Sequence, residues 1–180
     1  MPQEPLPSLP DRFESVEHLE EVMTAPTPAL HAALAELPGD IIILGVGGKM
    51  GPTLARLAKR AAPNKRVVGV ARFSEPALKA KLAGWGIECI EADLLDRAAM
   101  KRLPKLDNLV FMAGRKFGSS GREDLTWAMN AFVPALVGEA FAGSRIVAFS
   151  TGCVYPYVDV LHGGATEDVP PTPPTGDYAN

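Results

Sequence analysis

A glycine-rich segment is the strongest chemical signal in this chain of 180 residues. Gly45, Gly48 and Gly51 follow the apolar run 41–44, with a further glycine at position 47. In a strand–turn–helix unit, one glycine makes the turn, a second lets a pyrophosphate approach the backbone, and a third lets helix and strand pack closely. The start of the following helix then presents free N–H groups to phosphate. An ordinary tight turn also accounts for the glycines, but their place after a strand favours a phosphate site.

Two other side chains of this loop are candidate cofactor contacts. Met50 stands where a strict G-x-G-x-x-G pattern has its last glycine. Lys49 either touches the pyrophosphate or points to solvent. No serine or threonine follows Lys49, so the loop is not a Walker A motif.

The residues about 20 positions further on bear on the choice of dinucleotide. An acidic residue at the end of the second strand would bind the ribose 2′-hydroxyl of NAD, but Ala71 stands there and Arg72 follows. An arginine pairs instead with the 2′-phosphate of NADP, and Ser74 offers a hydroxyl donor nearby. A solvated surface arginine is the alternative interpretation. The sequence thus favours NADP over NAD without excluding either.

Alternating strands and helices must position these residues. Short apolar runs predict strands, and the segments between them predict helices. We expect strands at 41–44, 67–70, 87–90, 109–112 and 146–149, and helices at 50–61, 75–84, 96–102 and 123–142. This alternation predicts a Rossmann-like α/β fold, a doubly wound parallel sheet with right-handed crossovers and strand order 3-2-1-4-5.

A different segment precedes this domain. Residues 1–11 are rich in proline and should be extended, and apolar spacing predicts two short helices at 13–23 and 28–37. We therefore divide the chain into an N-terminal Pro-rich and helical arm, residues 1–39, and a nucleotide-binding domain, residues 40–180.

Charge and composition exclude several classes of protein. Residues 1–40 carry eight acidic and one basic side chain, whereas residues 41–180 carry 13 acidic and 17 basic ones. The mildly cationic domain suits a phosphate-bearing ligand, but its charges are too scattered for nucleic acid. No apolar run is long enough for a membrane span, and no signal peptide is visible. Two distant cysteines fit neither a zinc site nor a disulfide framework, which favours the cytoplasm.

Further short segments follow the glycine loop in a recognisable order. They are Ala92-Asp93-Leu94, Met112-Ala113-Gly114, Asn130 in the longest predicted helix, Ser150-Thr151 opening a segment that ends in Val154-Tyr155-Pro156, Thr166-Glu167-Asp168, and Tyr178, 27 residues after Thr151. Together with the glycine loop, they resemble the extended short-chain dehydrogenase/reductase family, the NAD-dependent epimerase/dehydratase group, over residues 40–180. The chain departs from the family pattern at Leu44, where the family has threonine, and at Pro156, where it has glycine.

The resemblance implies roles for these residues. Asp93 and Leu94 would contact the adenine, and Ala113, Gly114 and Asn130 would belong to the cofactor site. Tyr178 would act as general acid/base on a substrate hydroxyl, and Thr151 would hold the same oxygen. Hydride would move between the substrate carbon and the nicotinamide. The resemblance implies a small-molecule substrate such as a nucleotide sugar, and a homodimer.

In this family a lysine follows the tyrosine by four residues, and that position lies beyond residue 180. We therefore expect the chain to be part of a longer protein. A non-catalytic NAD(P)-binding sensor or scaffold is the alternative function, and a flavin- or other nucleotide-binding Rossmann domain is a third. No metal site is predicted, because His18, His31 and His162 are isolated. Cys153 and Trp127 are interpreted as packing residues.

Overall fold

A five-stranded parallel sheet organises the chain. The computed structural model describes residues 9–116, 121–172, 176 and 178. Within these residues the strands are ordered β3-β2-β1-β4-β5, and all neighbours run parallel. Their bounds are β1 (Ile41–Leu44), β2 (Val67–Ala71), β3 (Glu88–Glu91), β4 (Asn108–Phe111) and β5 (Arg145–Ala148). The order confirms the predicted Rossmann-like topology.

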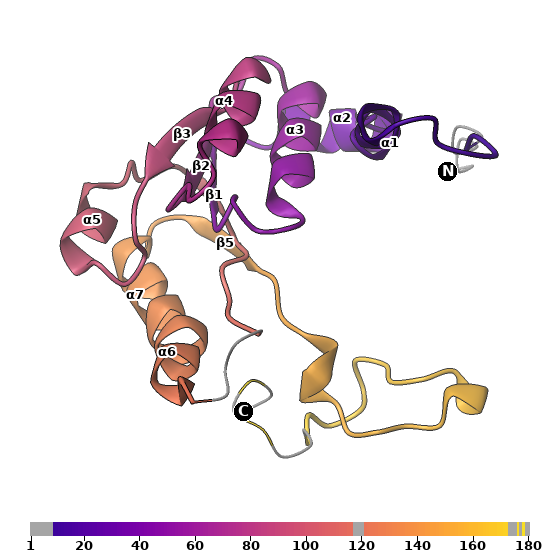
Figure 1. Cartoon of the computed structure of the whole chain (residues 1–180), viewed down its shortest axis with the longest axis vertical. Helices are drawn as coiled ribbons and strands as arrows, with labels where there is room; N and C mark the ends of the chain where they lie inside the picture. Colours follow the sequence, from indigo (N-terminus) through magenta and orange to yellow (C-terminus); the bar gives the residue numbers. More distant parts are fainter. Residues whose placement is uncertain (1–8, 117–120, 173–175, 177, 179–180) are drawn as a thin grey trace.

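Helices cover both faces of the sheet (Figure 1). Their bounds are α1 (Val16–Met23), α2 (Pro28–Glu36), α3 (Gly51–Ala61), α4 (Pro76–Gly84), α5 (Arg97–Arg102), α6 (Glu123–Trp127) and α7 (Val133–Ala140). Alternate side chains of β1 pack on opposite layers. Ile41 and Ile43 belong to the core that includes α3 and α4, and Ile42 and Leu44 belong to the core that includes α5 and α7. Burial on both faces explains why β1 is an unbroken apolar run.

The long helix predicted at 123–142 is interrupted. A π-helical turn, η1 (Ala128–Phe132), separates α6 from α7, and the Val133 N–H donates to the Ala128 carbonyl five residues back. Pro134 accounts for the change, because it has no N–H to donate to the carbonyl of Asn130. The π-helical turn therefore contains Asn130, one of the predicted site residues.

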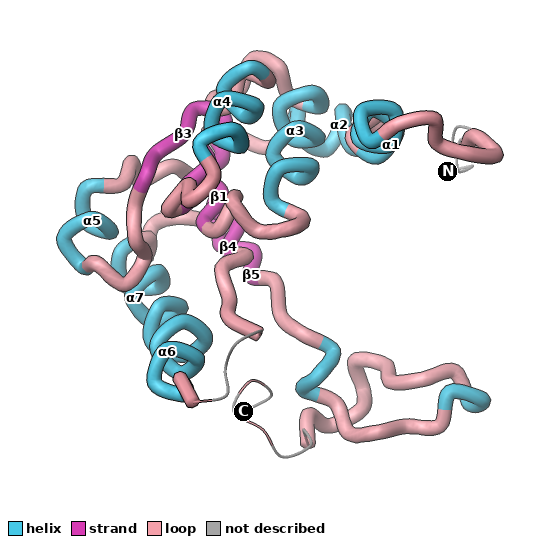
Figure 2. Tube along the Cα trace, viewed as in Figure 1, coloured by secondary structure: helices cyan, strands magenta, loops and turns pink. Residues whose placement is uncertain are grey.

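The last strand is an edge. Strand β5 begins one residue earlier than predicted, and all four of its residues are exposed, including Val147 at 61%. After β5 the chain leaves the sheet as a long excursion with two single 3-10 turns, η2 (Gly152–Val154) and η3 (Val160–His162), and then returns towards α6 (Figure 2). No helix among the described residues is long and apolar enough to cross a bilayer.

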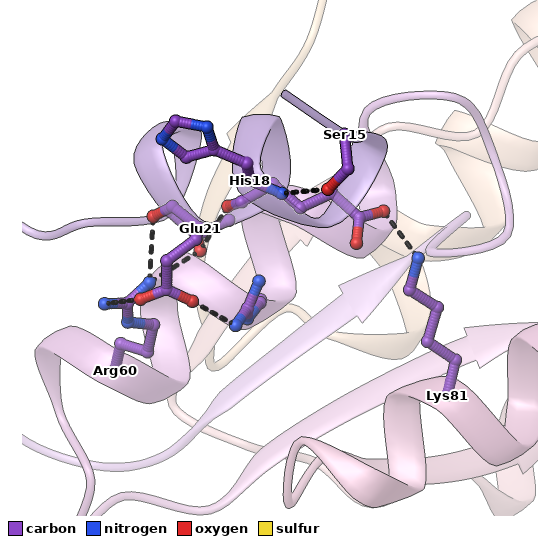
Figure 3. A network of polar contacts seen from close by, with 8 residues as sticks. Ser15, His18, Glu21, Arg60 and Lys81 are labelled. Carbon is purple, nitrogen blue, oxygen red and sulfur yellow. Dashed lines mark hydrogen bonds and ion pairs between the residues drawn. The ribbon is translucent and has the colours of Figure 1, made fainter. Parts of the chain in front are cut away.

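The N-terminal arm forms both predicted short helices, and its charged side chains contact the sheet-covering helices. Glu21 of α1 pairs with Arg56 (2.5 Å) and Arg60 (2.6 Å) of α3, and Glu20 pairs with Lys81 of α4 (2.5 Å) (Figure 3). Ion pairs near the surface contribute modestly to stability. These pairs therefore orient the arm, but they do not by themselves hold it against α3 and α4. Most of the Pro-rich start, residues 1–8, lies outside the described residues. The division of the chain at residues 39 and 40 stays a prediction.

A buried asparagine ties the end of the arm to the sheet. The Asn108 amide donates to the carbonyls of Pro38 (2.9 Å) and Asp40 (3.0 Å), and its oxygen accepts from Arg145 Nε (2.8 Å). Asn108 is only 7% exposed. We expect Asn108→Ala to lower the free energy of unfolding by about 1–3 kcal/mol, because three hydrogen bonds of a buried side chain are lost. Urea unfolding followed by circular dichroism measures the change.

The matched control is Asn64→Ala, at an exposed turn position. We expect it to change stability by less than about 0.5 kcal/mol. Equal effects of the two substitutions would contradict the role given to Asn108.

Candidate functional site

A cleft lies at the carboxyl ends of β1, β2 and β4. Its volume is about 320 Å³. This first cleft is lined by eight of the predicted cofactor residues: Gly45, Gly48, Arg72, Ser74, Asp93, Leu94, Ala113 and Gly114. In open parallel sheets, ligands bind outside the carboxyl ends of the strands where the strand order reverses, and here that point lies between β1 and β4.

The glycine loop has no room for side chains at two positions. Gly45 has φ +93°, and a Cβ there would lie 2.6 Å from the Ala113 nitrogen. A Cβ on Gly51 would lie 2.2 Å from the Val46 carbonyl oxygen. Gly45 thus lets the loop pass close to the end of β4, and Gly51 lets α3 pack against the loop.

The start of α3 follows the glycine loop and has no capping side chain. The Gly51 N–H donates to the Gly48 carbonyl (3.2 Å), and Pro52 at the second position carries no N–H. N–H groups at a helix start favour a phosphate. The glycines of the loop also place backbone atoms, and not side chains, at the cleft. The residues present therefore fit a dinucleotide pyrophosphate. Lys49, Met50 and Gly51 do not line the cleft themselves, and Met50 is 56% exposed.

Arg72 is the only cation among the residues that line the first cleft; Glu75 and Asp93 are its anions. Arg72 is exposed and lies directly beyond β2, as predicted. The Asp93 carboxylate follows β3 and accepts from the Leu95 N–H (2.9 Å), which fixes its orientation. The cleft therefore offers one positive side chain to an anionic substituent on its β2 side.

A second cleft, also about 320 Å³, continues from the first beyond Ala113 and Gly114. Its lining brings together Asn130, Thr151 and Tyr178, which the sequence places far apart. Apolar side chains form a wall of this cleft that is exposed to solvent. One of them is Trp127, which is 46% exposed. The interpretation of Trp127 as a packing residue was wrong. Helical spacing predicts which helix face a residue occupies, but not whether another element covers that face.

Asn130 holds the loop between the two clefts. Its side-chain oxygen accepts from the Arg115 N–H (2.8 Å), and its amide nitrogen donates to the Arg115 carbonyl (2.9 Å). The next residue, Lys116, places its ammonium 5.6 Å from the ring centroid of Tyr178. Across the cleft, the Thr151 hydroxyl accepts from the Cys153 N–H (3.2 Å). Asn130 thus acts on the backbone of the loop, a role that its place in the sequence alone did not indicate.

Cys89 and His31 lie outside both clefts. Burial raises the pKa of the Cys89 thiol. The His31 ring contacts the Ala61 carbonyl (2.9 Å). The described residues contain no group of three His, Cys, Asp or Glu side chains that could hold a metal ion.

The cleft-lining residues that sequence reasoning missed are mainly apolar. Val70, Phe73 and Leu78 line the first cleft on the β2 side, and Met112 and Met129 line it on the opposite side. Their types carry no chemical signal, so only the packing of the strands and helices could identify them.

The sequence profile of the NAD dependent epimerase/dehydratase family matches residues 41–180. Among solved structures, the chain is similar to the ADP-L-glycero-D-manno-heptose-6-epimerase of Helicobacter pylori, with TM-score 0.66 and 20% identity over 78% of this chain and 46% of that chain. It is also similar to the Bordetella bronchiseptica enzyme WbmG in complex with NAD and UDP (TM-score 0.64, 20% identity, 79% of this chain, 46% of that chain).

A third similar structure is the UDP-glucuronic acid 4-epimerase of Bacillus cereus in complex with NAD (TM-score 0.62, 21% identity, 78% of this chain, 47% of that chain). The chain spans less than half the length of these three proteins. No curated protein sequence matches it significantly.

Proposed function

Since this chain belongs to the NAD dependent epimerase/dehydratase family, we propose that it binds NADP or NAD in the first cleft and serves hydride-transfer chemistry on a hydroxyl or carbonyl carbon in the second. The glycine loop carries the cofactor part of the proposal. Its backbone passes too close to Ala113 and Val46 for any side chain at Gly45 or Gly51, and it leads into an uncapped helix start. That arrangement suits a pyrophosphate and offers little to an uncharged ligand.

The proposed chemistry assigns roles to three residues of the second cleft. The nicotinamide, when bound, accepts and returns a hydride. Tyr178 takes a proton from the substrate hydroxyl as its phenolate, or returns one to a carbonyl oxygen as its phenol. The Thr151 hydroxyl donates a hydrogen bond to the same oxygen and orients it. Asn130 keeps the loop at Arg115 in place, so that the wall between the clefts holds its shape.

We propose a nucleotide sugar as the substrate class. Support comes from the similar structures, one of which is in complex with UDP and another of which is a UDP-glucuronic acid 4-epimerase. We also propose a cytoplasmic location, supported by Cys89 and Cys153, the chain's two cysteines, both of which are free thiols. A homodimer stays a prediction.

A preference for NADP is the finer part of the cofactor proposal, and Arg72 tests it. We expect Arg72→Ala to weaken NADPH binding roughly ten- to hundredfold, because a charge-assisted contact to the 2′-phosphate is lost. NADH lacks that phosphate, so its affinity should stay within about twofold. Quenching of protein fluorescence during titration with each nucleotide measures both dissociation constants.

Arg102→Ala on α5 is the control, since Arg102 lines neither cleft. A wild-type chain that binds NADH more tightly than NADPH would overturn the preference. A chain that binds neither nucleotide would overturn the cofactor site itself.

A further inference from the structure

The turn after β2 contains an unusual backbone conformation. Phe73 has φ +45°, and it is the only residue other than glycine with positive φ among those the structure describes. A side chain with a Cβ is disfavoured in this region, and a bulky one especially so. Glycine or asparagine would be the usual choice for such a turn. The aromatic residue at this position therefore calls for a physical reason.

The environment of the ring supplies that reason. Phe73 is only 8% exposed and belongs to the core between the sheet and helices α3 and α4. The Lys79 ammonium lies 5.7 Å from the centre of its ring, and Lys79 also pairs with Glu91 at the end of β3 (3.3 Å). Burial of the ring offsets the backbone strain and holds this point of the turn in place.

The residues on either side differ from Phe73 in exposure. Arg72 and Ser74 are exposed, whereas Phe73 is buried, and all three residues line the first cleft. With the positive φ at position 73, the Phe73 ring packs in the core at the base of the cleft wall while its two neighbours stay exposed. Glu75, with the opposite charge to Arg72, lines the cleft as well. If the turn could rotate, the Glu75 carboxylate would face a phosphate as readily as the Arg72 guanidinium, and it would repel the phosphate.

We propose that Phe73 is a positioning residue for cofactor specificity. Its buried ring fixes the turn 72–75, so that Arg72 and Ser74 meet a 2′-phosphate on the adenosine ribose. This inference rests on the proposed binding of NADP in the first cleft. It assigns the selectivity to the anchored turn as a whole and not to Arg72 alone.

The test compares two nucleotides that differ by the phosphate in question, 2′,5′-ADP and 5′-AMP, by isothermal titration calorimetry on the whole chain. We expect Phe73→Ala to weaken 2′,5′-ADP binding about tenfold and to change 5′-AMP binding less than about twofold. Phe73→Gly should have the same effect, because glycine accepts the positive φ but leaves the turn without its anchor. Phe73→Leu, which keeps an apolar side chain in the core, should retain most of the selectivity.

Phe132→Ala is the matched control, since Phe132 is 42% exposed and does not line the first cleft. Its ratio of the two affinities should equal that of the wild type. An unchanged ratio in Phe73→Ala, or an equal loss of both affinities, would overturn the inference. If Phe73→Ala does not fold, Phe73→Gly and Phe73→Leu decide the question in the same way. Wild-type binding of neither nucleotide would instead overturn the proposed cofactor site.

Discussion

Gly51→Ala is expected to lower the free energy of unfolding by roughly 3 kcal/mol or more and to abolish dinucleotide binding. The added Cβ would lie 2.2 Å from the Val46 carbonyl oxygen and 2.6 Å from the carbonyl carbon. Both atoms are backbone, so the contact can be relieved only if α3 moves away from the glycine loop. Such a movement displaces the helix start that we propose for the pyrophosphate. Thermal unfolding and NADPH titration measure the two effects.

Gly138→Ala supplies a control of the same chemical change. Gly138 lies in α7, is exposed, and has nothing within 4 Å of the position of a Cβ. We expect this substitution to raise stability by about 0.5–1 kcal/mol, because alanine is the better helix former. The two substitutions should therefore change the free energy of unfolding in opposite directions. A neutral Gly51→Ala would show that the helix and loop are not packed as described.

Leu44→Ala is expected to cost about 2–5 kcal/mol of stability, the usual range for a buried leucine. Leu44 is fully buried in β1, in the core shared with α5 and α7, and it directly precedes the glycine loop. The cavity left by its side chain borders the turn at Gly45, so nucleotide binding should weaken as well. Denaturant unfolding gives the stability change.

Leu161→Ala makes the same truncation at an exposed site. Leu161 is 87% exposed in η3, on the excursion that follows β5. The expected change is below about 0.5 kcal/mol. Comparable losses at positions 44 and 161 would mean that the excursion after β5 is buried in solution, contrary to the structure.

The predicted strands and their order were confirmed because the signals are local. An apolar run followed by glycines and then by a helical pattern can be recognised in the sequence. The right-handed crossover rule then leaves few ways to arrange such units in a sheet. The position of the first cleft at the carboxyl ends of β1, β2 and β4 follows from the same rule, which is why eight predicted residues line one cleft. The π-helical turn at 128–132 was missed, because the apolar spacing predicts one helix over 123–142 and does not register the backbone hydrogen bond that Pro134 removes in its interior.

Within the site, the sequence by itself determined which residue types stand at the strand ends: glycines after β1, Arg72 after β2 and Asp93 after β3. Tertiary structure alone decided which of them share a cavity, and it added Phe73, whose aromatic side chain gives no hint of its backbone conformation. The physical reason is that residue type and spacing set local conformation and the exposed face of each element. Contacts such as those of Asn130 with Arg115 depend on distances between segments that only the packed sheet brings together.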